Sequence, residues 1–593
     1  MPDIIITTDT VTSSTQNLGT DLGALFFLAG DSVLVNATTT GIGGSGPGQS
    51  FFINGEVAVD GVGLSSTGDA VSIDLNGLMS ADSTGISATG ENSAISVAGS
   101  LFADGIGVSI AGDGALLSVS GTITSDGVGI NMSGDESTVS ISGNVTADGN
   151  GITAEGNRAE ITITASGSVI GNDFGMRLGT ITGIETGESS TLTNAGMIAG
   201  VDAGIGITTS GTINNSGTIA KTGNGTFVGS GGPAAIMIYN GANKIVTINN
   251  TGDILSSDIN SGGTITEGYA ITVEASTDTS VDLNNGGNIL GRVLGGTNVD
   301  DINNSGLIDG DIDLRSGNNI LTNVGQIFGE VSAGSDIDIL TNRGEIIGNV
   351  DLGSGSDVVF NTGSIAGFFE LGDGEDIYFG AGAGLVVSLV DGGLGNDTLV
   401  GGAAGDLLEG GDNNDEVFGR GGDDTLAGGS GDDTVVGGEG ADFLRGDSGA
   451  DFVAGQDGND TLIGGGGDDR LFGGQGNDDI TSGLGADILR GDGGQDVFIF
   501  SNVAETGTGS TRDRILGWED GADLIDLSGF GALEFSASGA VGGGTASVWF
   551  DAVSAGTQTM LRIDSDGDGT FDGQVLLVRA GPGLFDQADL ILA

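Results

Sequence analysis

The sequence predicts an all-β protein built as a repeating solenoid: a parallel β-helix, a tighter repeat region and a short C-terminal segment. Three observations support this prediction. A unit of nine residues is repeated twelve times without a gap over 392–499. Segments of 22 residues begin at Gly55, Gly77, Gly99, Gly121 and Gly143, and a third motif recurs every 19 residues from Asn285 to Asn361. A fixed short period indicates a solenoid in which each repeat contacts only its neighbours.

Residues 1–54 are expected to cap the β-helix, because an uncapped solenoid end exposes unpaired strand edges. Residues 55–384 are expected to form the β-helix itself. Each 22-residue segment holds short alternating stretches separated by Gly and Asp, such as LFA, VSI and LSV within 99–120. Alternation predicts strands with one buried face, and three such strands suit one coil of a parallel β-helix.

The motif Asn-x-Gly-x-Ile recurs at Asn285, Asn304, Asn323, Asn342 and Asn361, with earlier copies at Asn194, Asn215 and Asn250. Stacked Asn side chains can hydrogen-bond along a solenoid, so we interpret these residues as scaffold. Fifteen residues after each of the five regular Asn lie Asp300, Asn319, Asp338, Asp357 and Asp376. Asp357 and Asp376 are candidate cation ligands; the alternative is that they are solvated turn carboxylates.

The nine-residue unit reads Gly-Gly-x-Gly-x-Asp-x-apolar-x. Glycine is needed in the turn because the backbone there visits positive φ. Twelve aligned carboxylates would repel one another, and Ca²⁺, which accepts six to eight oxygen ligands, resolves that repulsion. The candidate metal ligands are the position-six residues Asp397, Asp406, Asp415, Asp424, Asp433, Asp442, Asp451, Asp460, Asp469, Asp478, Asp487 and Asp496. The copies over 401–418 depart from the pattern at position four, which is Ala404 and then Asn413.

This unit resembles the RTX repeats of secreted bacterial proteins. The resemblance implies a calcium-bound parallel β-roll over 385–500 with roughly ten Ca²⁺. The segments around Asp357 and Asp376, LGSGSDVVF and LGDGEDIYF, resemble single RTX turns. Residues 511–531 resemble the region that follows RTX repeats in serralysin-type proteins. Residues 501–593 are therefore expected to hold a small β cap and a type I secretion signal, after a right-handed β-helix and the β-roll.

Composition excludes several classes of protein. The net charge is −66, which argues against nucleic acid and anionic membranes as partners. The chain has no Cys and no His, which removes disulfides, zinc-protease motifs and histidine-based triads. No apolar run is long enough for a membrane helix, and the N-terminus lacks the features of a signal peptide. The RTX resemblance nevertheless implies an extracellular or cell-surface protein exported by type I secretion machinery.

Two further places are candidate sites. Asp564, Asp566 and Asp568 have the spacing of a calcium loop, but position twelve is Val575 where such loops carry Glu, so a hydrophilic turn is the alternative. Segment 221–245 holds both lysines of the chain, Lys221 and Lys244, with Tyr239 and Pro233. This segment is where we would look for a ligand site.

The sequence offers no evident catalytic group, and no catalytic residue is predicted. Sugar-cleaving sites commonly need His and Tyr, or Arg and Lys beside carboxylates. We therefore expect a secreted calcium-binding structural protein of the bacterial surface layer or extracellular matrix, which self-assembles on Ca²⁺. The alternative is an adhesin or glycan-binding protein that contacts cell-surface polysaccharide. A third possibility is a polysaccharide lyase or epimerase on the β-helix.

Overall fold

The computed structural model of the chain divides into two compact units, Met1–Glu330 and Val331–Ala593, and each is described by itself. The structure describes residues 4–593 except 7–9, 13–15, 18–23, 28–31, 36–39, 179–188, 224–232, 240–243, 260–264, 275–277, 382–388, 520, 537–543, 555–557 and 579–586. The described elements are nearly all strands. The helical ones are short 3-10 turns: η1 (Val503–Glu505), η2 (Gly509–Thr511), η3 (Ser528–Phe530) and η4 (Gln587–Asp589).

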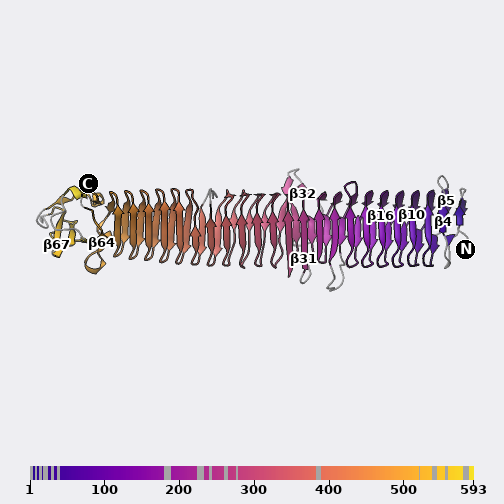
Figure 1. Ribbon diagram of the computed structural model, residues 1–593, viewed down its shortest axis with the longest axis horizontal. Coiled ribbons are helices and arrows are strands. Elements are labelled where there is room, and N and C mark those ends of the chain that lie inside the picture. Colours follow the sequence, from indigo (N-terminus) through magenta and orange to yellow (C-terminus); the bar gives the residue numbers. More distant parts are fainter. Residues whose placement is uncertain are drawn as a thin grey trace. The chain divides into compact units, whose positions relative to one another are not determined.

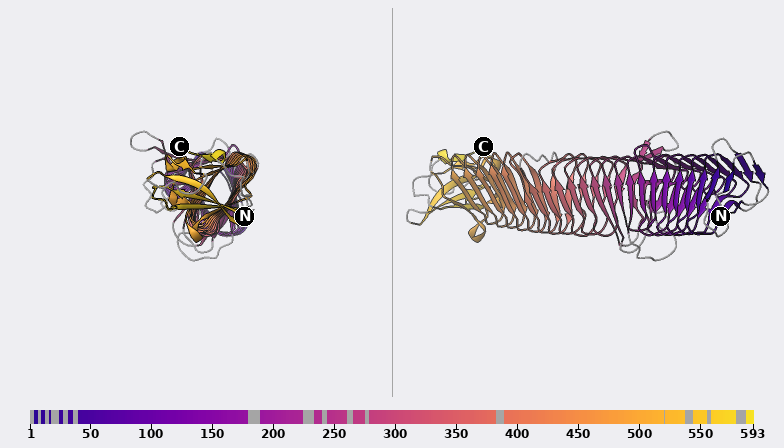
Figure 2. Two further views of the ribbon diagram at one scale, coloured as in Figure 1. Left: turned by 90° about the vertical axis from the view of Figure 1, so that its left-hand side faces the viewer. Right: turned by 45° about the vertical axis from the view of Figure 1, so that its right-hand side comes forward.

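The first unit is a parallel β-solenoid with three strands in each coil. One coil consists of β13 (Ala94–Val97), β14 (Ser100–Ala103) and β15 (Val108–Ile110). Each strand pairs in parallel with the strand 22 residues later: Ile95 lies opposite Leu117, Leu101 opposite Ile123 and Val108 opposite Ile130. Figure 1 and Figure 2 show the successive strands stacked in chain order within the unit. The three-strand coil predicted from the 22-residue period is confirmed.

Alternating burial holds each coil on the next. In β13, Ile95 and Val97 are buried, whereas Ala94 faces solvent. The same inward position recurs as Leu117 and Val119, then as Val139 and Ile141, so apolar side chains stack along the inside of the coil. Each such side chain contributes about 1.5–3 kcal/mol when it is fully buried.

Parallel pairing also occurs within residues 1–54. β1 (Ile4–Ile6) pairs with β4 (Ala24–Phe27), and β4 pairs with β7 (Ser50–Ile53). The domain boundaries expected at 54/55, 384/385 and 500/501 stay predictions.

The second unit changes from three strands per coil to two. A three-strand coil is formed by β47 (Val358–Asn361), β48 (Ser364–Ile365) and β49 (Phe369–Asp373). In the nonapeptide region each coil takes 18 residues, and Val435 lies opposite Val453. One sheet contains β52 (Thr398–Val400), β54 (Glu416–Gly421), β56 (Thr434–Glu439), β58 (Phe452–Asp457), β60 (Arg470–Gln475) and β62 (Ile488–Gly493). The facing sheet contains β51 (Val390–Leu394), β53 (Leu407–Asp412), β55 (Thr425–Ser430), β57 (Phe443–Ser448), β59 (Thr461–Gly466), β61 (Asp479–Leu484) and β63 (Val497–Ile499).

The strand pairing continues past the last nonapeptide. β64 (Asp513–Leu516) pairs in parallel with β62, and β65 (Leu524–Asp526) pairs with β63. Three antiparallel strands follow: β67 (Ser547–Ser554), β68 (Gln558–Asp564) and β69 (Gly573–Val578). Because β69 also pairs with β64, these strands cover the C-terminal edge of that sheet. No helix in the described part of the chain is long and apolar enough to cross a membrane.

Candidate cation-binding ladder

Each nonapeptide places its Asp inside the turn that precedes a strand. In the copy 428–436, Asp433 is 2% exposed and immediately precedes β56. The turn before it has positive φ at position two, Gly429 (111°), and at position four, Gly431 (142°). These two glycines fold the backbone around the carboxylate, as the sequence pattern predicts.

The Asp side chains form two interleaved ladders, one on each side of the roll. The backbone N–H of Asp433 donates to Oδ1 of Asp451, 18 residues later, at 2.9 Å. The same hydrogen bond recurs from Asp397, Asp406, Asp415, Asp424, Asp442, Asp451, Asp460, Asp469 and Asp478, each to the Asp 18 residues later. Oδ1 of each acceptor is therefore occupied by protein.

The second oxygen of these carboxylates is different. Oδ2 is buried and has no hydrogen-bond partner among the described residues in eleven of the twelve copies. A buried carboxylate oxygen without a donor is expensive, because the protein supplies nothing in place of its lost water. A hard cation with oxygen ligands is the group that this arrangement fits, and the buried oxygens are the donors that it would use.

Asp406 is the exception. Its Oδ2 accepts the backbone N–H of Gly402 at 2.7 Å, so this turn is closed on its own carboxylate. Position four of the turn is Ala404, whose φ is not positive. Of the two turns that the sequence marked as divergent, the first therefore differs in structure, whereas the second, with Asn413 at φ 84°, leaves Oδ2 of Asp415 without a partner among the described residues.

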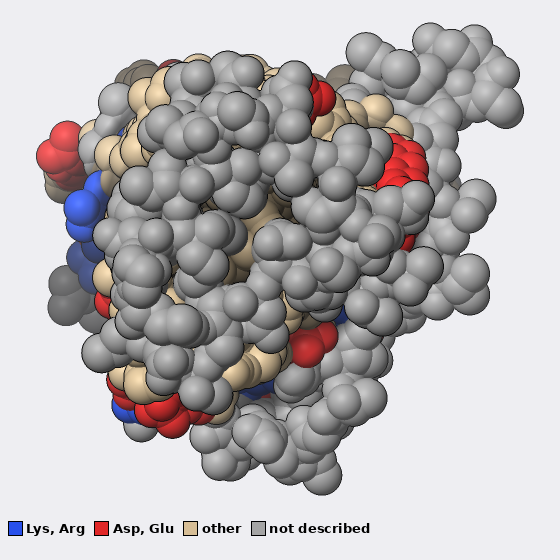
Figure 3. Space-filling model, turned by 90° about the vertical axis from the view of Figure 1, so that its right-hand side faces the viewer, with Lys and Arg blue, Asp and Glu red and all other residues tan. Residues whose placement is uncertain are grey.

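Burial dominates the electrostatics of the ladder. It raises the pKa of Asp415 to about 8 and that of Asp469 and Asp478 to about 7, and neighbouring carboxylates add to the rise. Hydrogen bonds from backbone N–H groups lower the pKa of the same three residues. Few basic groups are available to help, since the chain has 15 Lys and Arg against 81 Asp and Glu. Figure 3 views the end that carries the N-terminus, rather than the ladder, where some acidic and some basic side chains are visible among the described residues.

Upstream of the repeats, the structure distinguishes Asp300 from Asp357 and Asp376 within the 19-residue ladder. Asp300 has both oxygens occupied, because Oδ1 accepts Val281 N–H at 2.7 Å and Oδ2 accepts Gly296 N–H at 2.8 Å. Asp357 and Asp376 are equally buried, but Oδ2 of each has no partner among the described residues. Oδ1 of Asp357 accepts from Asp338, and Asn319 accepts from Asp300.

Downstream, two residues that sequence reasoning missed extend the ladders. Asp513 Oδ1 accepts the N–H of Asp487 at 2.9 Å, and Asp523 Oδ1 accepts that of Asp496 at 3.4 Å. Burial raises the pKa of Asp513 to about 8 and that of Asp523 to about 6. The nonapeptide spacing is lost here, so no periodic signal marks these two residues.

The C-terminal loop brings three carboxylates together. One oxygen each of Asp564, Asp566 and Asp572 lies within 4.8 Å of the others. Asp572 was not among the predicted residues, although it occupies position nine of the loop. Both oxygens of Asp564 already accept backbone N–H groups, from Gly567 and Gly569. These contacts suit the alternative given in the sequence analysis, a hydrophilic turn.

Segment 221–245 lies partly outside the described residues, at 224–232 and 240–243. Lys221 is buried, and its Nζ donates to the carbonyl of Gly223 at 2.6 Å. Lys244 Nζ donates to the carbonyl of Tyr239 at 3.0 Å, and burial lowers the pKa of this lysine. Both lysines therefore contact backbone within their own segment, as structural cations do.

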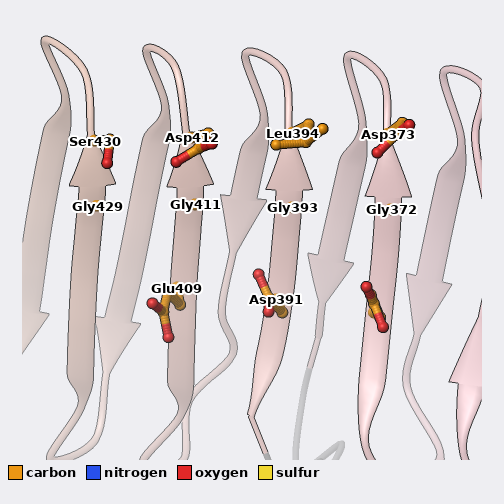
Figure 4. Close-up of a pocket in the computed structure, with 11 residues that line it drawn as sticks. Gly372, Asp373, Asp391, Gly393, Leu394, Glu409, Gly411, Asp412, Gly429 and Ser430 are labelled. Atoms are coloured by element: carbon orange, nitrogen blue, oxygen red, sulfur yellow. The ribbon is translucent and has the colours of Figure 1, made fainter.

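A second acidic feature lies on the outer face of the second unit. Glu370, Asp391 and Glu409 are in register on β49, β51 and β53 and line a shallow groove of about 360 Å³ (Figure 4). Burial, followed by the charges of Glu409 and Glu370, raises the pKa of Asp391. Like charges directly opposite on neighbouring strands destabilise a sheet, so this face also favours cations in the surrounding solvent.

Comparisons with known proteins agree with the geometry of the repeat region. The family model described as the RTX calcium-binding nonapeptide repeat (4 copies) matches residues 391–426, 427–462 and 463–498. No curated protein matches the chain. The solved structures that are similar to this chain include two subunits of the Azotobacter vinelandii mannuronan C5-epimerase. The AlgE6R2 subunit is 24% identical with a TM-score of 0.18, and the match covers 27% of this chain and 92% of that one. The AlgE6R3 subunit is 25% identical with a TM-score of 0.18, and the match covers 30% and 78%. On the family match and the ladder geometry, residues 391–498 are an RTX calcium-binding repeat region.

Proposed function

We propose that the protein is an extracellular structural protein whose repeat region folds when Ca²⁺ fills the carboxylate ladder. The observation that carries this proposal is the set of eleven buried Asp residues whose Oδ2 has no protein partner. In the apo chain these carboxylates oppose folding, and the binding free energy of the cations then becomes folding free energy. The ligands we assign in the repeats are Asp397, Asp415 and the nine position-six residues from Asp424 to Asp496.

Secretion of the chain is consistent with folding that depends on Ca²⁺. RTX repeats are typical of secreted proteins, and we infer that type I secretion machinery exports the chain and reads its C-terminal region. Low cytoplasmic Ca²⁺ would keep the repeat region unfolded before export. Extracellular Ca²⁺, at the concentrations that suit weak extracellular sites of about 10⁻⁴–10⁻³ M, would then fold it.

We further infer that the folded protein assembles with copies of itself into a surface layer or extracellular matrix. A chain of stacked coils with a net charge of −66 repels its own copies until cations screen or bridge the acidic faces. Cell-surface polysaccharide is a candidate partner of such a layer.

A Ca²⁺ titration of the purified chain tests the proposal. Circular dichroism follows β-structure, and light scattering and negative-stain microscopy follow assembly, with Mg²⁺ as the control cation. Folding together with ordered sheets or filaments is the expected result. Folding without assembly would remove the surface-layer role and favour the glycan-binding alternative, which a glycan array tests, or a carbohydrate-active enzyme, which activity on alginate and pectin-like polymers tests. No response to Ca²⁺ would overturn the proposal as a whole.

A further inference from the structure

We propose that the cation ladder begins before the matched repeats, with two additional Ca²⁺ sites formed by the turns at 352–357 and 371–376. This inference rests on the proposed calcium binding of the repeat region. Both turns lie outside residues 391–498, which match the RTX family model.

The first argument is the state of the two carboxylates. Asp357 and Asp376 are 0% and 1% exposed, and Oδ2 of each has no hydrogen-bond partner among the described residues. Oδ1 of each accepts the N–H of the preceding ladder residue at 2.7 Å. Asp376 N–H in turn donates to Oδ1 of Asp397 at 2.8 Å. The two residues therefore continue into the first nonapeptide through the same hydrogen bond that links the repeats.

The second argument is the backbone of the turns. Gly353 and Gly355 have φ of 88° and 153°, and Gly372 and Gly374 have φ of 111° and 158°. The first nonapeptide has 100° and 136° at Gly393 and Gly395. Turns with this conformation keep the N–H of position two away from the carboxylate, which leaves Oδ2 available.

The contrast with Asp300 supports this reading. Gly296 stands at position two of its turn and does not have a positive φ, and its N–H donates to Asp300 Oδ2. Asp300 is therefore buried to the same degree with both oxygens occupied by protein. Burial alone therefore does not leave a carboxylate oxygen unpartnered, because in Asp300 the N–H of Gly296 reaches Oδ2.

The third argument is the position of the carbonyl groups. A Cβ at Gly372 would overlap the carbonyl oxygen of Gly353, and a Cβ at Gly374 would overlap that of Gly355. The carbonyl oxygens of Gly353 and Gly355 thus face the next turn, and that of Gly353 also accepts the N–H of Asp373 at 2.9 Å. Carbonyl and carboxylate oxygens together form the donor set that Ca²⁺ takes in proteins. We assign one ion to the gap between 352–357 and 371–376, and one to the gap between 371–376 and 392–397.

Position one differs from the repeats. Leu352 and Leu371 stand where eleven of the twelve nonapeptides have Gly, and both side chains are buried. This change breaks the Gly-Gly-x-Gly-x-Asp pattern while the rest of the turn is kept, which explains why the sequence motif starts later than the ladder.

Native mass spectrometry of the full chain at saturating Ca²⁺ tests the inference by counting bound ions. The double variant Asp357→Asn, Asp376→Asn should bind two ions fewer than the wild type. Asn is tolerated at this ladder, because Asn319 occupies it in the native chain with its Oδ1 accepting Asp300 N–H. The matched control is Asp300→Asn, which should leave the count unchanged.

A wild-type count in the double variant would overturn this inference while leaving the proposed function intact, whereas a wild-type chain that binds no Ca²⁺ would sink the proposed function itself. Anomalous scattering from calcium in wild-type crystals provides a measurement that needs no variant. Peaks beside Asp357 and Asp376 are expected, and a calcium-loaded repeat region without them would overturn the assignment.

Discussion

The molecule contains two kinds of buried polar ladder, and they are completed in opposite ways. In the first unit, Asn250 Nδ2 donates to Oδ1 of Asn285 at 2.8 Å, and Asn215 donates to Asn250 in the same way. An amide carries both a donor and an acceptor, so a stack of Asn residues satisfies itself without charge. In the second unit an ionised Asp has only acceptors. The backbone occupies Oδ1, and Oδ2 requires something that the described chain does not provide.

This difference predicts that chelation destabilises the Asp-ladder region and leaves the Asn-ladder coils largely unaffected. Removal of Ca²⁺ should abolish amide-exchange protection over 391–498 and leave the Asn-ladder coils protected. Each site filled at about 100 times its Kd contributes about 2.7 kcal/mol, so the summed effect over the repeats is the largest expected here. Hydrogen exchange with and without chelator measures it. Equal loss of protection in both regions would contradict the comparison.

When Ca²⁺ is absent, the folding stability of the two ladder regions should also depend differently on pH. Burial raises the pKa of Asp469 to about 7 and that of Asp433 to about 6, above the ordinary value of 3.8. A group whose pKa is raised by folding stabilises the fold below its unfolded pKa, and that contribution is lost as the pH rises through the folded pKa. In chelator, the repeat region should therefore gain stability on acidification from about pH 8 to about pH 4.

Thermal unfolding at several pH values in chelator checks this expectation, with the Asn-ladder coils as the internal reference. With Ca²⁺ present the trend should reverse, because protons compete with the cation for the same carboxylates. A repeat region that loses stability on acidification in chelator would refute the expectation that burial in the folded state raises the pKa of these carboxyl groups.

The next largest effect on stability is expected when an Asn of the buried amide ladder is replaced by Asp. Asn250→Asp removes the Nδ2 donor and places a carboxylate against the Oδ1 atom of Asn285. Burying that unsatisfied charge should cost about 3 kcal/mol or more. The matched control is Asn284→Asp, since Asn284 lies in an exposed ladder and contacts Asn249, and its cost should be below about 0.5 kcal/mol. Denaturant unfolding of both variants makes the measurement.

The sequence predicted most of both ladders because period and chemistry coincide there. Asn285 and Asn304, or Asp433 and Asp451, stand at a fixed spacing that matches one coil of the solenoid. The sequence could not separate Asp300 from Asp357, because the distinction lies in whether a turn N–H reaches Oδ2. It also missed Asp513 and Asp523, which pairing of β64 and β65 brings under the last repeats after the period has ended.

Within the Asp ladder, the turn of Asp406, whose Oδ2 accepts a backbone N–H, should differ in cation binding from the turns whose Oδ2 has no partner among the described residues. Asp424→Asn removes a carboxylate whose Oδ2 has no partner among the described residues. It should raise the Ca²⁺ concentration needed for half-folding about tenfold, equivalent to about 1.4 kcal/mol. Asp406→Asn changes a carboxylate whose Oδ2 already accepts Gly402 N–H, so it should leave the Ca²⁺ requirement nearly unchanged. Calcium titrations followed by circular dichroism compare them. A larger effect at Asp406 would show that its turn opens to bind the cation.

The smallest effect concerns strain in the turns of the ladder. Arg420, Asp447, Gln456 and Asp492 occupy position two with φ between 72° and 79°, a conformation that costs an L side chain about 1–2 kcal/mol. Arg420→Gly should therefore stabilise the calcium-loaded repeat region by about 1 kcal/mol, less the entropy that Gly gains in the unfolded chain. Gly438→Ala is the reverse change at the same position, and it should destabilise because the new Cβ would meet the carbonyl of Arg420. Thermal unfolding with Ca²⁺ measures the change in stability for each substitution. A rise for Arg420→Gly and a fall for Gly438→Ala would establish that the positive φ at position two, rather than the side chain there, determines the stability of the calcium-loaded turn.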